Sequence, residues 1–271
     1  MNKTIPFPAD PRTAFAIRSA FAFLQELEIQ VLPADPFSIA YECGWRIHSY
    51  SAASDHLQLS LNEFRASSAM REAFTVYRRK PVIFYDDVRL NRDRILFSLC
   101  HEFGHIVLKH FADFRYITLN DAQLQLLDRE ASIFAANLLA PPAVVHAISP
   151  EKRQRCRKIF GMSQAAWQHR LSSLEADLSV LTNEQQALQL KQFDRWMHAV
   201  RCRDCGISFH HAGHTACPHC GGKRFVWQPH SAAAHVISPI QHVVPIPRIL
   251  TNTVAKGRIL TAELENPMIL E

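Results

Sequence analysis

The segment His101-Glu102-Phe103-Gly104-His105 constrains this chain more than any other feature of its sequence. On an α-helix the two histidines lie on one face, one turn apart, so both imidazoles can bind one metal ion. Glu102 lies about 100° around the helix, where its carboxylate can hold a water molecule instead of binding the ion. In such a site the metal acidifies the water and polarises a scissile carbonyl, while the carboxylate transfers the proton. The segment therefore predicts a metal-dependent hydrolase.

A solvated helix face is the alternative interpretation of these three polar residues, because the five-residue pattern also occurs by chance. The flanking sequence argues against that alternative. Asn91 is placed to cap the helix and Asp93 falls in its first turn. The expected buried face is strongly apolar and consists of Ile95, Leu96, Leu99, Cys100, Phe103, Ile106 and Val107. Polar groups within such a helix need partners, which favours a metal site.

A catalytic zinc ion usually has three protein ligands and one open position, so a third ligand is expected. The next predicted helix, residues 121 to 140, offers Asp128 and Glu130, which point to different sides of it. Asp128 shares its face with small residues such as Ala131 and Ser132, which would allow close approach to the motif helix, whereas Glu130 shares its face with bulkier side chains. This geometry favours Asp128, with Glu130 as the runner-up.

His110 and Tyr116, which both follow the motif in sequence, are candidates for stabilising the oxyanion that forms during hydrolysis. A structural role is the competing interpretation of each, and the sequence favours it.

The remaining pattern predicts an α+β fold. Helical periodicity is expected over residues 12–29, 36–43 and 152–197. Short β-branched or alternating segments at residues 45–50, 57–61 and 81–85 predict a small, mostly antiparallel sheet of about three strands.

Several ordered blocks of this sequence resemble the ImmA/IrrE family of gluzincin-like metallo-endopeptidases. They span roughly residues 12 to 175 and include Pro36-Phe37-Ser38-Ile39-Ala40, Val82-Ile83-Phe84-Tyr85, Phe97 to His105, Asp128 to Ala135, Leu138-Leu139-Ala140-Pro141 and Arg170-Leu171. The resemblance implies a zincin-like catalytic domain. It also implies a substrate class, since similar proteins make a limited cut in a helix-turn-helix repressor.

The resemblance further implies that the third ligand is the first residue of a Glu-x-x-Ala-Asn/Asp pattern, which Ala131 places at Asp128. This chain departs from that pattern by carrying Asp128 in place of Glu and Ser132 in place of Asn or Asp. Zinc is the expected catalytic metal, with manganese as the alternative.

Two Cys-x-x-Cys segments near the C-terminus, Cys202 to Cys205 and Cys217 to Cys220, predict a closed structural zinc site of four thiolates. A glycine follows each pair and allows the tight turn that such a site needs. The histidines nearby could replace a cysteine as ligand or be exposed loop residues: His210, His211, His214 and His219. Zinc should supply most of the folding energy of so small a module.

The formal net charge is only +5 and no block of like charges stands out, which argues against a dedicated nucleic-acid-binding arm. Residues 191–230, however, hold six Lys or Arg against two Asp. Contact of the ribbon with a phosphate backbone or an acidic protein surface therefore stays open. The alternative function is thus a weakly active or inactive zincin that binds a DNA-bound or toxin-like partner through its ribbon.

The expected organisation is a zincin-like metallopeptidase domain over residues 1–185, a helical linker over 186–197, a zinc ribbon over 198–230 and an extended or poorly ordered tail over 231–271. No signal peptide or membrane-spanning run is recognisable, and seven cysteines without a disulfide framework favour a reducing compartment. The expected location is therefore the cytoplasm.

Overall fold

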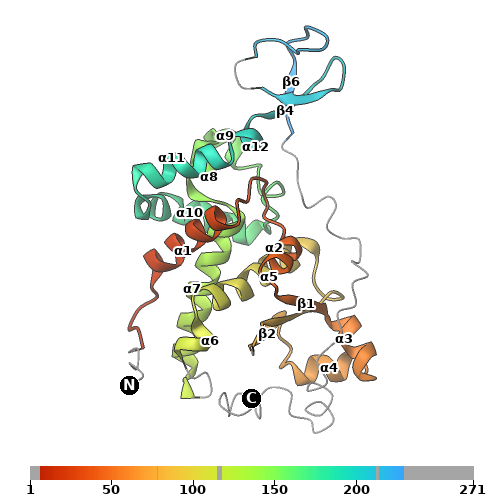
Figure 1. Ribbon diagram of the computed structural model, residues 1–271, viewed down its shortest axis with the longest axis vertical. Helices are drawn as coiled ribbons and strands as arrows, with labels where there is room; N and C mark the ends of the chain where they lie inside the picture. Colours follow the sequence, from red (N-terminus) through yellow and green to blue (C-terminus); the bar gives the residue numbers. More distant parts are fainter. Residues whose placement is uncertain (1–6, 78, 115–117, 212–213, 229–271) are drawn as a thin grey trace. The chain divides into compact units, whose positions relative to one another are not determined.

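The computed structural model describes residues 7–77, 79–114, 118–211 and 214–228 (Figure 1). Tyr116 and the predicted tail at 231–271 lie outside the described residues. The described chain divides into two compact units, one holding residues 7–19 and 36–135, the other residues 20–35 and 136–228. Helices α1 (Thr13–Glu26) and α7 (Asp121–Leu139) each contribute to both units.

The first unit combines short helices with one small sheet, so the predicted α+β class is confirmed. Its other helices are α2 (Pro36–Glu42), α3 (Tyr50–Leu57), α4 (Leu61–Ser67), α5 (Arg92–Val107) and α6 (His110–Asp113). Its strands are β1 (Arg46–Ser49), β2 (Ala73–Val76) and β3 (Val82–Tyr85).

The sheet has the strand order β1-β3-β2, with the apolar strand β3 in the centre. Strands β1 and β3 are parallel, with Ile47 opposite Ile83, whereas β2 and β3 are antiparallel, with Phe74 opposite Phe84. The sheet is therefore mixed, where a mostly antiparallel one was expected. Strand β2 forms one edge, and α5 packs against β2 and β3.

An aromatic cluster joins α3 and α4 to this sheet. Tyr50, Phe64, Phe74 and Phe84 are each at most 1% exposed, and their ring centroids lie 5.1 to 6.5 Å apart. The Tyr50 hydroxyl donates a hydrogen bond of 2.9 Å to the main-chain oxygen of Arg71 at the chain's approach to β2. This cluster is the core behind the sheet.

The strand predicted over residues 57–61 is wrong, because these residues link two helices. Ser60 caps α4 in a reciprocal arrangement with Glu63, which starts a new helix within the predicted strand. The alternating leucines of the segment do face the core, since Leu57, Leu59 and Leu61 pack against the aromatic cluster. Alternation here reflects burial of a short link and not a β-strand.

Helix α5 begins where the sequence predicts. The Asn91 side chain accepts a hydrogen bond of 3.1 Å from the Arg94 amide, and Asp93 lies in the first turn. Leu96, Leu99 and Phe103 on its apolar face are at most 3% exposed. This buried face fixes the rotation of the helix and so the direction of its polar side chains.

Helices α5 and α7 contact each other at Gly104, between the two motif histidines. A Cβ atom at Gly104 would lie 2.8 Å from the Cα atom and 2.9 Å from the carbonyl oxygen of Ala131. Any residue with a Cβ atom at this position would force the two helices apart. Gly104 therefore sets how closely the two helices approach, as the small residues of α7 predicted.

The second unit holds the remaining helices and a separate three-stranded sheet. The helices are α8 (Pro142–Ala147), α9 (Pro150–Arg153), α10 (Gln164–Val180), α11 (Asn183–Gln192) and α12 (Asp194–Met197); the strands are β4 (Ala199–Cys202), β5 (Ser208–His210) and β6 (Phe225–Trp227). Arg170 of α10 is fully buried, where its guanidinium donates 2.9 Å to the Ala140 oxygen and forms an ion pair of 2.5 Å with Asp177. Among the described residues, no helix has the length and apolar character needed to cross a membrane.

Candidate metal centre

His101 and His105 lie one turn apart on α5 and direct their imidazoles to the same point. Their Nε2 atoms are 3.1 Å apart. The other ring nitrogen of His101, Nδ1, lies 3.1 Å from the Ser132 hydroxyl of α7. Burial, and secondarily the charge of His105, lowers the pKa of His101 to about 3. The ring is therefore neutral near pH 7 and has a lone pair to offer.

Asp128 of α7 lies beside both histidines. Its Oδ1 atom is 3.3 Å from His105 Nε2 and 4.0 Å from His101 Nε2, and its side chain is 62% exposed. The close helix contact at Gly104 brings α7 near enough for this short carboxylate. The three predicted ligands thus come together, and one side of the group remains open to solvent.

The three donor atoms fit a zinc ion. Zinc binds imidazole nitrogen and carboxylate oxygen at about 2.0–2.2 Å, so ligand atoms in a tetrahedral site lie roughly 3.3–3.5 Å apart. The observed separations of 3.1, 3.3 and 4.0 Å bracket this value. Three protein donors also leave the fourth position that a catalytic site requires.

Glu102 is buried beside this group and held by a neighbouring strand. Its side chain accepts a hydrogen bond of 2.6 Å from the Thr75 hydroxyl of the edge strand β2. Burial raises the pKa of Glu102, while the charge of His105 and the bond from Thr75 act against this shift. A raised pKa makes a carboxylate a better proton acceptor.

Glu130, the runner-up for the third ligand, points away from the two motif histidines. Its carboxylate binds the Arg12 guanidinium at 2.8 Å and the His110 ring at 3.0 Å. Burial opposes its ionisation, but the hydrogen bonds from His110 and Arg12 outweigh burial and lower the pKa of Glu130 to about 2. The structure therefore brings Asp128, and not Glu130, to the histidine pair.

Comparison with known proteins agrees with this geometry. Residues 54–172 match the sequence profile of Peptidase M78, described as the IrrE N-terminal-like domain. The chain contains an IrrE N-terminal-like domain. M78 is a family of metallo-endopeptidases, so the predicted enzyme class is confirmed. No curated protein and no solved structure matches the chain.

Some residues around the centre of the IrrE-like domain were missed by the sequence interpretation. Thr75 lies in β2, which the sequence interpretation did not identify, although the run from Ala73 to Val76 has β-forming residues and β2 is as long as the predicted strands β1 and β3. Arg12 is far from the motif in sequence, and nothing local to it signals the contact with Glu130. His110, considered for oxyanion stabilisation, is fully buried between His105 and Glu130.

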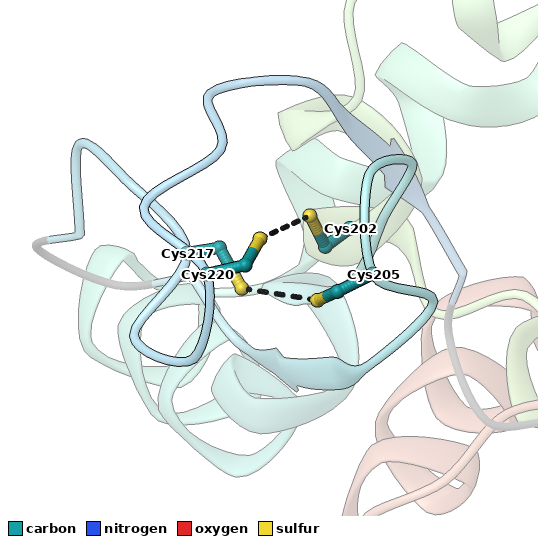
Figure 2. Close-up of side chains that lie close together, drawn as sticks. All are labelled: Cys202, Cys205, Cys217 and Cys220. Atoms are coloured by element: carbon teal, nitrogen blue, oxygen red, sulfur yellow. Dashed lines mark hydrogen bonds between the residues drawn. The ribbon is translucent and has the colours of Figure 1, made fainter.

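The second predicted metal site lies outside the matched domain, in the sheet with order β5-β4-β6. Figure 2 shows its four cysteines facing one another, with 3.7 Å between the sulfur atoms of Cys202 and Cys220 and 3.6 Å between those of Cys205 and Cys217. A zinc ion with Zn–S bonds of about 2.3 Å separates thiolates by roughly 3.8 Å. The cluster is thus consistent with a zinc ribbon.

Glycines shape both knuckles as expected. Gly206 and Gly221 have positive φ angles of 76° and 72°, and their amides donate to the main-chain oxygens of Cys202 and Cys217. Of the nearby histidines, His210 forms an ion pair of 3.2 Å with Asp194. His198 also pairs with Asp194, at 3.0 Å, so these three side chains form a surface ion-pair group.

Proposed function

We propose that this protein is a zinc-dependent endopeptidase that makes a limited cut in a regulatory protein. In this proposal His101, His105 and Asp128 hold the catalytic metal and Glu102 is the general base. The observation that supports it is the convergence of three donor atoms beside a buried carboxylate. Manganese is the alternative metal at this centre, while the four cysteines are assigned structural zinc.

A bound zinc ion would supply the positive charge that polarises the scissile carbonyl and acidifies a water molecule. Glu102 would accept the proton from that water and deliver it to the leaving amine. Thr75 would hold one carboxylate oxygen of Glu102 and leave the other for the proton. Ser132 would orient His101 by its contact with Nδ1.

The position of β2 supports a substrate bound in extended form. Its outer edge has no strand partner among the residues that the structure describes, and its Thr75 side chain contacts the proposed general base. A peptide that added to this edge would pair with the main chain of β2 and pass beside Glu102. The family resemblance adds the substrate class, a helix-turn-helix transcriptional regulator.

The alternative is a binding module in which the ribbon contacts a DNA-bound or toxin-like partner and cleavage is weak or absent. The basic residues of the ribbon region support this alternative. For either function we propose the cytoplasm as the location, since a reducing compartment keeps four zinc-binding thiolates from forming disulfides.

Replacing Glu102 by Gln tests the proposal. Co-expression with the helix-turn-helix regulator encoded nearest to the gene should show cleavage by the wild type and none by Glu102→Gln, while metal content stays the same. Glu42→Gln, at an exposed position of α2, is the control and should cleave normally. Survival of the biological effect in Glu102→Gln would favour the binding module.

A further inference from the structure

A series of polar side chains in contact, which we call the relay, runs from the metal centre to Arg12; its members are His105, His110, Glu130 and Arg12. His105 Nδ1 lies 3.0 Å from His110 Nδ1, and His110 Nε2 lies 3.0 Å from Glu130 Oε2. The side chains of His110 and Glu130 are both 0% exposed. Burial without partners would be costly for each group, so this order of contacts is a specific arrangement.

Several contacts hold the Arg12 end of the relay in place. Arg12 donates to the Glu130 carboxylate from its main-chain amide at 2.7 Å, from Nε at 3.0 Å and from Nη2 at 2.8 Å. Its guanidinium also lies over the rings of Phe15 and Phe114, at 4.9 and 5.5 Å from their centroids. Glu130 is therefore an ion-paired carboxylate, which accepts hydrogen bonds and donates none.

The hydrogen positions along the relay follow from the Glu130 carboxylate, which can only accept hydrogen bonds. Glu130 must receive a proton from His110 Nε2, and in a neutral ring this leaves His110 Nδ1 as an acceptor. Only one hydrogen can lie between His110 Nδ1 and His105 Nδ1, so His105 Nδ1 donates it. In a neutral ring, His105 Nε2 is then the unprotonated nitrogen, so that its lone pair and the Asp128 carboxylate, 3.3 Å away, face one another as acceptors between which a cation would fit.

We infer that Glu130 and His110 are positioning residues that fix the tautomer and ring orientation of His105, so that its Nε2 lone pair faces the metal. This inference rests on the proposed metal centre. Metal binding through His105 Nε2 itself requires the hydrogen on Nδ1, so one assignment of hydrogens satisfies both hydrogen bonds and the metal. Partners of this kind typically change metal affinity by 10–100-fold.

His110→Phe tests the inference because it keeps a buried ring while removing both ring nitrogens. Zinc affinity at the catalytic centre, measured by competition with a chelator, should fall by about 10–100-fold. The ribbon zinc should be retained. His48→Phe is the matched control, since His48 is also buried in this unit but stacks on Phe84 instead of contacting the relay. It should leave zinc affinity unchanged.

Two further measurements separate positioning from packing. His110→Asn offers a carbonyl oxygen near the place of His110 Nδ1 and should recover part of the lost affinity. Long-range ¹⁵N–¹H spectra of the chain with its catalytic zinc removed and its ribbon zinc retained should show His105 protonated on Nδ1 in the wild type and in a tautomer mixture in His110→Phe.

A wild-type His105 protonated on Nε2, or a His110→Phe variant with unchanged zinc affinity, would overturn the inference. Neither readout uses cleavage. If the relay fails these tests while Glu102→Gln still abolishes cleavage, the proposed function stands without the relay. If zinc does not bind at this centre in the wild type, it is the proposed function that fails.

Discussion

The two candidate metal centres of this protein are built in opposite ways. The four cysteines of the ribbon lie between Cys202 and Cys220, and each pair is held by its own glycine turn. The proposed catalytic donors come from two helices, and the side chains that contact this site and its neighbours come from as far away as Arg12 and Thr75. A structural site needs only to be closed, whereas a site with an open position needs surrounding groups to hold its ligands in place.

The largest expected effect is on the ribbon. Cys217→Ser should remove its zinc and unfold residues 199–228, because structural zinc contributes roughly 10–16 kcal/mol to modules of this kind. Metal analysis should find two zinc ions in the wild type and one in this variant, with the catalytic zinc retained. Cys43→Ser, outside the cluster, is the control and should keep both. A third zinc in the wild type would indicate binding by the surface group of Asp194.

The next effect is loss of the catalytic zinc alone. Asp128→Ala removes a direct ligand, so cleavage should fall by more than the roughly 100-fold seen for supporting residues. The ribbon zinc should remain. Asp121→Ala, on the same helix but remote from the centre, should keep both ions.

Asp128→Glu gives a sharper result at the same position. It restores the usual residue of the family but adds a methylene where the helices are already close at Gly104. Because Asp128 lies beside both histidines, Asp128→Glu should keep or raise zinc affinity, whereas reduced affinity would show that the helix contact requires aspartate.

Glycine substitutions compare the two regions directly. Gly104→Ala places a Cβ atom against the backbone of Ala131, so we expect a loss of about 1–3 kcal/mol in unfolding free energy together with a weaker hold on the catalytic zinc. Adding Ala131→Gly should not restore this loss, because the clash is with main-chain atoms. Gly221→Ala meets no atom within 4 Å and is strained only by its φ of 72°, so about 1 kcal/mol is expected. Chemical denaturation, with metal release followed in the same experiment, distinguishes the effect of Gly104→Ala from that of Gly221→Ala.

The smallest effect is expected at Thr75. Thr75→Val keeps the shape of the side chain but removes the hydrogen bond to Glu102, so kcat/KM should fall by about tenfold, or roughly 1.4 kcal/mol, without metal loss. Thr75→Ser keeps the hydroxyl and should lose less. A loss in Thr75→Ser with none in Thr75→Val would mean that the methyl group, and not the hydroxyl, matters.

The sequence predicted what is local. Helical spacing identified His101 and His105, the small residues beside Asp128 indicated a close helix contact, and paired cysteines with glycines indicated the ribbon. The sequence interpretation failed for features that tertiary contacts determine. The segment at 57–61 alternates like a strand because it covers an aromatic core, and β2 was missed although it is as long as β1 and β3. No pattern near Glu130 shows that its partner is Arg12, because that contact spans 118 positions.

The position of Arg12 in the sequence also affects how far this enzyme could be shortened from its N-terminus. The family match begins at residue 54, so a fragment cut to the matched segment would retain both motif histidines, Glu102 and Asp128. It would lack Arg12, and the buried carboxylate of Glu130 would lose three of its four hydrogen-bond donors. Such a fragment would carry every proposed metal ligand and the proposed general base, and we still expect it to be a poor peptidase. We therefore expect a fully active domain to begin upstream of residue 54, where the family match starts.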